Sequence, residues 1–289
     1  MSSQKNTLMA AVFLAGAVAI QSAPVVAQAA QNPQSSPAQS NQQPTLKPSG
    51  SSLAIPAAPA NPEETTALQT FQSMPNTDLP KKIAAGEDFL KKYPDSQYRP
   101  MVYSALVLGY LQTGNAQKAF EVGDKEVALK PDDVETLAVL GQTIPRAINS
   151  STPDPDKQLQ KAEDYAKRAI EVTPTIAKPE GMTDQHFMEA KNSTLAMAHG
   201  GLGLVYFRRG KFNEAIPELE QSVKIDPNPN PDPVNLYVLG VSNQKASHYD
   251  EAAAVFARCA TIAGGLQTAC KTAADESKKQ ASTQMSTPK

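Results

Sequence analysis

The sequence contains few of the residue types from which catalytic and metal sites are built. Its 289 residues include three histidines, two cysteines and no tryptophan. The histidines and cysteines lack the spacing of a metal site, and neither a Gly-x-Ser-x-Gly elbow nor a phosphate-binding glycine loop is present. We therefore expect no enzymatic activity, no bound metal ion and no cofactor. An enzyme would require an insertion to bring His186 beside a nucleophile.

Two short motifs that could be read as catalytic have simpler explanations. The glycines of "HGGLG" at 199–203 resemble an oxyanion loop of some hydrolases, but they fall inside a predicted helix. The carboxylates of Asp132 and Asp133 lie at a predicted helix start, where capping explains them. Neither motif changes the expectation.

The chain also lacks strong charge and a long apolar run. Its formal net charge of −2 gives no field that would recruit nucleic acid or an anionic membrane. The apolar run from Leu8 to Ile20 has only thirteen residues, short of the ~20 that cross a bilayer. Lys5 precedes this run and small residues, Ala27 and Ala29, follow it, as is typical of a cleaved secretion signal. We expect cleavage after Ala29, no membrane insertion of the mature protein, and a periplasmic or secreted location.

Residues 30–60 lack periodic apolar positions. They carry a single charge, Lys47, and consist mainly of Gln, Ser, Pro and Ala. This composition predicts a disordered tether, either a spacer or an unselected remnant of the leader. We likewise expect residues 280–289 to form a disordered tail.

Helix signals begin at Asn61, which supplies a cap directly before Pro62 at the first helical position. Asp154 and Asp232 each precede a proline in the same way. No segment shows the sustained alternation of a half-buried strand. The folded part of the chain is therefore predicted to be all-helical.

A repeated pattern connects these helices. Pro227 follows Gly203 by 24 positions, and Pro131 follows Val107 by the same number. The pair Leu140-Gly141 follows Leu106-Val107 after 34 residues, which is the tetratricopeptide period.

On these residues the chain resembles tetratricopeptide-repeat (TPR) proteins, and "FLKKYPDSQYRP" is similar to a phrase of bacterial envelope members. The resemblance implies a right-handed α-solenoid over residues 61–279, with about five helix pairs from Asn61 to Gly265 and a closing helix from Leu266 to Lys279. Insertions near 145–156 and 175–192 interrupt the array. A cap at Thr183 or Asp184 would make one first helix overlong.

The resemblance further implies a concave groove lined by the first helices of the pairs. The Lys and Asn set with which some members hold a C-terminal carboxylate is not matched, since Ser104 and Leu108 occupy two of its places. A peptide or amphipathic helix held by apolar anchors fits this lining better, unless the tether or an insertion fills the groove. The implied groove residues are Leu108, Leu111, Leu204, Phe207, Arg208, Tyr237, Val241 and Lys245.

The two cysteines are predicted to form a disulfide. Cys259 lies five residues before Gly264, and Cys270 lies five residues after Gly265. A tight turn at the glycines would place them opposite each other on antiparallel helices, in an exported and therefore oxidising location. The alternative is two free cysteines in the core.

Together these features predict a non-enzymatic exported TPR scaffold that binds another envelope polypeptide through a mainly apolar concave groove. The alternative is a structural subunit of an envelope assembly that associates with itself or docks by its convex face. Either protein would have a polypeptide partner and no nucleic acid.

Overall fold

The computed structural model describes residues 61–75 and 77–286. This part of the chain contains eleven α-helices, one short 3-10 helix and no strand. The helices are α2 (Pro62–Ser73), α3 (Leu79–Lys92), α4 (Arg99–Gln112), α5 (Ala116–Leu129), α6 (Val134–Ala147), α7 (Pro155–Val172), η1 (Thr173–Thr175), α8 (Asp184–Arg208), α9 (Phe212–Ile225), α10 (Pro233–Lys245), α11 (Tyr249–Ala260) and α12 (Gln267–Ser286). They form five successive pairs and a closing helix, so the predicted all-helical solenoid is confirmed.

The sequence signals for helix starts are met with one exception. The side chains of Asn61, Asp133 and Asp232 each accept a hydrogen bond from a backbone N–H in the first turn of the helix that follows. Asp154 precedes Pro155 as predicted, but it has a left-handed backbone (φ 45°) and makes no capping bond. Thr183 caps α8, which runs for 25 residues and is the predicted overlong first helix.

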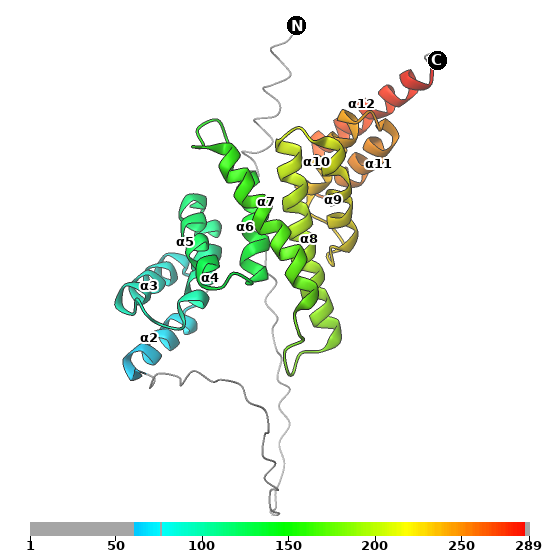
Figure 1. Ribbon diagram of the computed structural model, residues 1–289. Helices are drawn as coiled ribbons and strands as arrows, with labels where there is room; N and C mark the ends of the chain where they lie inside the picture. Colours follow the sequence, from blue (N-terminus) through cyan, green and yellow to red (C-terminus); the bar gives the residue numbers. More distant parts are fainter. Residues whose placement is uncertain (1–60, 76, 287–289) are drawn as a thin grey trace, which may run out of the picture.

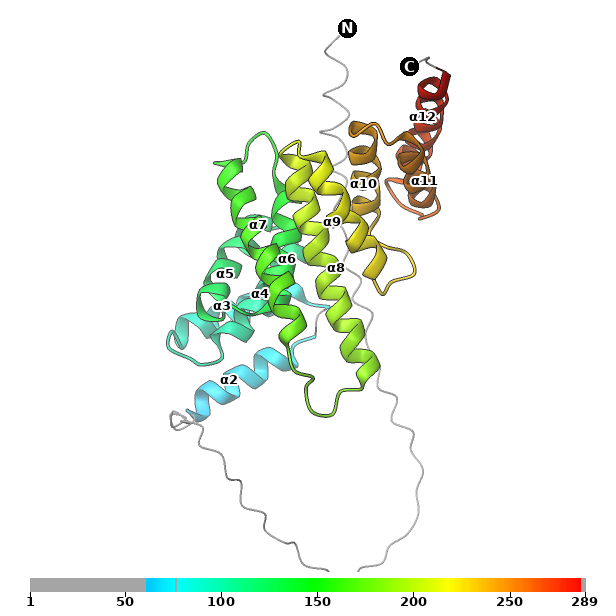
Figure 2. The same cartoon turned by 45° about the vertical axis from the view of Figure 1, so that its right-hand side comes forward.

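The pairs are arranged along a line with α6 to α8 at the centre. Helices α2 to α5 lie at one end of the molecule and α10 to α12 at the other (Figure 1). Figure 2 shows the long α8 beside α6 and α9. Six clusters of buried side chains lie along the array, and most of them combine residues of neighbouring pairs. This is the quasi-one-dimensional packing of a repeat array.

The predicted limits of the solenoid need one correction. The closing helix α12 ends at Ser286 and not at Lys279, because Cys270, Ala274, Ser277 and Ala281 form a buried stripe that keeps it packed beyond the predicted end. The predicted signal at 1–29 and tether at 30–60 lie outside the described residues. Within the described ranges, every helix is too short or too polar to cross a membrane.

Candidate partner-binding surface

The eight predicted groove residues lie on three first helices, α4, α8 and α10, but they do not share one open surface. Leu108 is 42% exposed on α4, whereas Leu111, one turn later, packs against two core clusters. Lys245 is exposed at the end of α10. The middle members of the set are the ones that differ most from the expectation.

On α8, two predicted groove residues belong to the core. Leu204 is 1% and Phe207 8% exposed, and both pack against the clustered side chains of α9 and α10. The ring of Phe207 meets that of Phe212 edge-on at 5.8 Å. These two side chains therefore stabilise the solenoid and offer little surface to a partner. This corrects the prediction that rested on the resemblance to TPR proteins.

Arg208, also on α8, binds the C-terminal end of α6. Its Nε donates to the carbonyl of Pro145 at 3.0 Å, and its Nη2 donates to that of Ile148 at 2.9 Å. Both acceptors belong to the end of α6, whose last carbonyls have no partner within the helix. Burial lowers the pKa of Arg208 from its usual value. Arg208, which we predicted at the basic edge of the groove, thus caps the C-terminal end of α6 from the next helix pair.

Tyr237 and Val241 on α10 are half-buried and face the closing helices. The ring of Tyr237 lies edge-on to that of Phe256 at 5.6 Å, and both residues pack against the cluster that α11 and α12 share. Burial raises the pKa of the Tyr237 hydroxyl. Their contribution to the surface is therefore partial.

An exposed pair of apolar side chains lies on α4. Met101 and Leu108 are 41% and 42% exposed, and their separation of seven residues places them two turns apart on one face of the helix. Leu108 also borders a cavity of about 250 Å³ between α4, the start of α3 and Phe71 at the end of α2. Met101 was not among the predicted residues, although its i, i+7 relation to Leu108 is visible in the sequence.

The glycines of "HGGLG" serve packing. A Cβ on Gly201 would lie 2.6 Å from the backbone of Gly141 in α6, and one on Gly203 would lie 2.5 Å from Leu219 Cγ in α9. Gly200 faces Asn235 of α10 in the same way. Three glycines therefore let α8 approach three different helices. Helix packing explains the motif, and a catalytic role is not needed to explain it. His199 Nδ1 lies 2.7 Å from Glu218 Oε2 of α9, and His186 is exposed in the first turn of α8.

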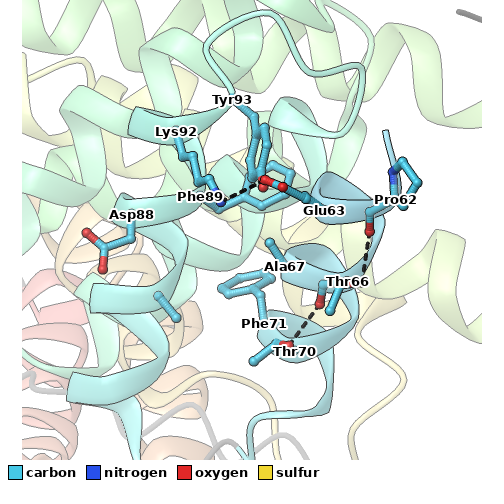
Figure 3. A pocket seen from close by; sticks show the side chains of 11 residues that line it. Pro62, Glu63, Thr66, Ala67, Thr70, Phe71, Asp88, Phe89, Lys92 and Tyr93 are labelled. Atoms are coloured by element: carbon cyan, nitrogen blue, oxygen red, sulfur yellow. Dashed lines mark hydrogen bonds and ion pairs between the residues drawn. The ribbon is translucent and has the colours of Figure 1, made fainter. Parts of the chain in front are cut away.

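A second hollow lies between α2 and α3, and it has a volume of about 720 Å³ (Figure 3). Its lining includes the largely buried rings of Phe71, Phe89 and Tyr93 and the small side chains of Ala67 and Ala85. At its rim, Lys92 Nζ lies 3.4 Å from Glu63 Oε2. None of the predicted groove residues lines this hollow.

One fully buried carboxyl group lines neither cavity. Glu126 on α5 is 0% exposed, and neither of its carboxyl oxygens has a hydrogen-bond partner of good geometry. Burial, reinforced by the nearby Asp133 carboxylate, raises its pKa to about 7. The Thr136 and Ser104 hydroxyls and the Lys130 ammonium counter part of this effect. Among the described residues, no group of three or more His, Cys, Asp or Glu side chains is placed to hold a metal ion.

The closing helix is joined covalently to the last pair. Cys259 of α11 and Cys270 of α12 form a disulfide, with a distance of 5.7 Å between their Cα atoms. Both residues are fully buried, within one cluster with Val223 and Leu236. The bond closes the turn at Gly264 and Gly265.

Comparison with known proteins supports the repeat assignment. Residues 196–229 match the model of the tetratricopeptide repeat family, and they include the stretch from Gly203 to Pro227 on which the period rests. No curated protein matches the chain.

Solved structures of similar arrangement include two of MamA and one of PilW. A MamA RS-1 double mutant is 16% identical, with a TM-score of 0.50 over 69% of this chain and 93% of that one. MamA is 21% identical, with a TM-score of 0.49 over 68% and 89% of the two chains. PilW, a type IV pilus biogenesis factor, is 16% identical, with a TM-score of 0.48 over 80% and 97%. At these identities the likeness concerns the fold alone.

The chain thus carries a tetratricopeptide repeat at 196–229 and continues it in both directions as paired helices with the same small-into-large contacts. Its fold is an α-solenoid of five helix pairs with a closing helix.

Proposed function

We propose that this TPR protein is an exported, non-enzymatic scaffold that binds an apolar segment of another cell-envelope polypeptide. The observation that carries the proposal is the exposed pair Met101 and Leu108 on α4, beside a cavity of about 250 Å³. TPR solenoids are interaction scaffolds, and paired apolar anchors two turns apart suit an amphipathic helix or a short extended peptide. Export rests on the N-terminal sequence pattern described above.

The exposed fractions of the side chains favour anchors on α4 over the expected anchors on α8. Leu204 and Phe207 hold the core together, so a variant at either position would lower stability and binding alike. Leu108 borders the cavity and is 42% exposed, so a change there alters the surface and leaves the core intact. This difference makes Leu108 the position at which binding is best tested.

Capture from envelope extracts with Leu108→Glu and Leu129→Glu tests the binding surface. Leu129 is 41% exposed on α5 and lines neither cavity, so it is a matched control for adding a carboxylate in place of an exposed leucine. We expect Leu108→Glu to lose the captured polypeptide and Leu129→Glu to retain it, with unchanged helical content in both. Equal capture by the two variants would refute binding at α4.

Two further measurements test the remaining parts of the proposal. A mature N-terminus at Ala30 in the exported fraction is expected from the signal, and an uncleaved cytoplasmic chain would contradict export. The alternative is a structural subunit that associates through its convex face. A stable homo-oligomer of the purified protein by light scattering would favour that alternative over a monomeric adaptor.

A further inference from the structure

The joint between the second and third helix pairs differs from the one that follows it. The second pair, α4 with α5, lies to one side of α6 and α7 (Figure 1). Between the third pair and α8 the backbones approach directly, since a Cβ on Gly201 would lie 2.6 Å from Gly141. At the earlier joint, α4 contributes one fully buried apolar side chain, Val107, and the other apolar contributors from α4 and α5 are partly buried: Leu111, Phe120, Val122 and Val127. Polar side chains complete the contact.

The outer side of this joint, between the second helices α5 and α7, is held by ion pairs. Lys161 Nζ of α7 lies 2.6 Å from Asp124 Oδ2 of α5, and the Tyr165 hydroxyl donates to Asp124 Oδ1 at 2.8 Å. Arg168 of α7 donates to Asp132, in the turn after α5, at 2.6 Å. These contacts fasten α5 to α7 and do not involve the first helices α4 and α6.

The inner side of the joint, between α4 and α6, contains the buried carboxyl group of Glu126. The hydroxyls of Ser104 on α4 and Thr136 on α6 lie beside this group, and their oxygens are 3.3 Å apart. Two ionisable groups also act on it, Asp133 at the start of α6 and Lys130 at the end of α5. Lys130 Nζ is paired with Asp133 Oδ2 at 2.7 Å. The ammonium that faces Glu126 is thus already engaged by another carboxylate.

The charge of Glu126 therefore decides how well the inner side holds. A protonated carboxyl group can donate to one neighbouring hydroxyl and accept from the other, which links α5 to both α4 and α6. An ionised group places a second negative charge beside Asp133, and Glu135 adds a third near Lys130. Such a buried charge is costly, and access of water relieves the cost. Burial raises the pKa of Glu126 to about 7, so the change of charge falls near neutral pH.

We propose that the joint between the second and third helix pairs is a hinge, which opens on its inner side when Glu126 loses its proton. The ion pairs of Asp124 and Asp132 serve as the pivot, while α4 moves away from α6 and water reaches the carboxylate. Helices α2 to α5 move together, because one buried cluster includes residues of all four. Opening also turns Leu108 on α4 relative to the third pair. The hinge needs no bound partner, so it and the proposed binding at Leu108 can fail separately.

Two spin labels measure the opening in the full chain. Gln112 at the end of α4 and Glu220 on α9 are exposed and lie on opposite sides of the joint, whereas Lys157 on α7 lies on the same side as Glu220. Cys259 and Cys270 are bonded to each other, so labels attach to introduced cysteines. Double electron–electron resonance gives the distance between the labels at about pH 5 and about pH 9, on either side of the titration of Glu126.

The distance across the joint should depend on pH. With Gln112→Cys and Glu220→Cys, we expect the mean distance to lengthen by several ångströms from acid to alkaline pH. Lys157→Cys with Glu220→Cys should give the same distance at both pH values. Glu126→Gln should abolish the change across the joint, since glutamine keeps the shape and cannot ionise. Glu121→Gln, on the exposed face of α5, should retain it.

Three outcomes would overturn the hinge. The first is an equal distance across the joint at both pH values in the wild type. The second is a change that survives Glu126→Gln, which would assign it to another group such as one of the three histidines, whose usual pKa lies in the same range. The third is an equal change between Lys157 and Glu220, since the whole array would then respond and not this joint.

Discussion

At the scale of single residues, Glu126 is a carboxyl group that folding buries completely. Burial in the core favours the protonated form of a carboxyl group, and the Glu126 pKa of about 7 reflects this. In the unfolded chain the same group has a pKa near 4.5. Between these two values the unfolded state releases a proton that the folded state keeps. The free energy of unfolding contributed by Glu126 therefore falls as pH rises from 4.5 to 7.

Glu126→Gln should remove this dependence. Because one pKa unit corresponds to about 1.4 kcal/mol, the cost at alkaline pH is about 3 kcal/mol. We expect Glu126→Gln to be more stable than the wild type at about pH 8 by up to this amount, and to differ little from it at about pH 4. Urea unfolding at the two pH values measures the difference.

The control for this prediction is Glu121→Gln on the exposed face of the same helix. It removes one carboxylate and leaves the core unchanged, so its effect should be small at both pH values. A stability gain for Glu126→Gln that is the same at acid and alkaline pH would show that packing, and not ionisation, is responsible.

At the scale of elements, the sequence predicts helices well and their outer faces poorly. Caps such as Asn61 and Asp133 are local interactions, so their residues alone indicate where α2 and α6 begin. The exposure of Leu204 and Phe207 depends instead on which neighbours surround α8. That helix contacts α6, α7, α9 and α10, and a helix covered on so many sides has no free first-helix face. The resemblance to TPR proteins implied that the first helix of every pair has one open face.

The same reasoning explains why the prediction included Leu108 but not Met101. Seven residues apart on α4, they form one stripe, but whether that stripe is covered depends on how α2 and α3 pack against α4. The hollow between α2 and α3 likewise depends on which side chains of the two helices come together, Ala67 and Ala85 among them. No spacing within one helix shows such a pairing.

The link between α11 and α12 gives a prediction at this scale. The disulfide joins two cysteines that are eleven positions apart. It restricts the unfolded chain and stabilises the fold by roughly 2 to 3 kcal/mol in the loop-entropy estimate. The double change Cys259→Ser with Cys270→Ser should lower the free energy of unfolding by that amount. Hydrogen exchange should rise mainly in α12, since the bond fastens that helix. Non-reducing mass spectrometry of the exported protein checks the premise, and two free alkylatable thiols would contradict it.

At the scale of the whole molecule, stability should be unevenly distributed along the array. In a solenoid each pair contacts only its neighbours, so central pairs are held from both sides and terminal pairs from one. The centre here has an additional tie: Arg146 at the end of α6 donates to Asp232 at 2.6 Å and to Asn235 at 3.0 Å, both at the start of α10. Helices α6 and α10 are thus connected across α8.

A close approach of the backbones of α6 and α8 in this centre yields the last prediction. A Cβ on Gly201 would lie 2.6 Å from the carbonyl carbon and oxygen of Gly141. Backbone atoms cannot relieve such a clash by a change of side-chain rotamer. Gly201→Ala must therefore separate α6 from α8, whereas Gly265→Ala meets no atom within 4 Å and serves as the control. In the wild type, amide hydrogen exchange should be slowest in α6 and α8 and faster toward α2 and α12. Gly201→Ala should bring the exchange of α6 and α8 up to that of the ends and leave the ends nearly unchanged. If exchange is instead uniform along the wild-type chain, the array unfolds as one cooperative unit, and the α6–α8 contact is not what holds its centre.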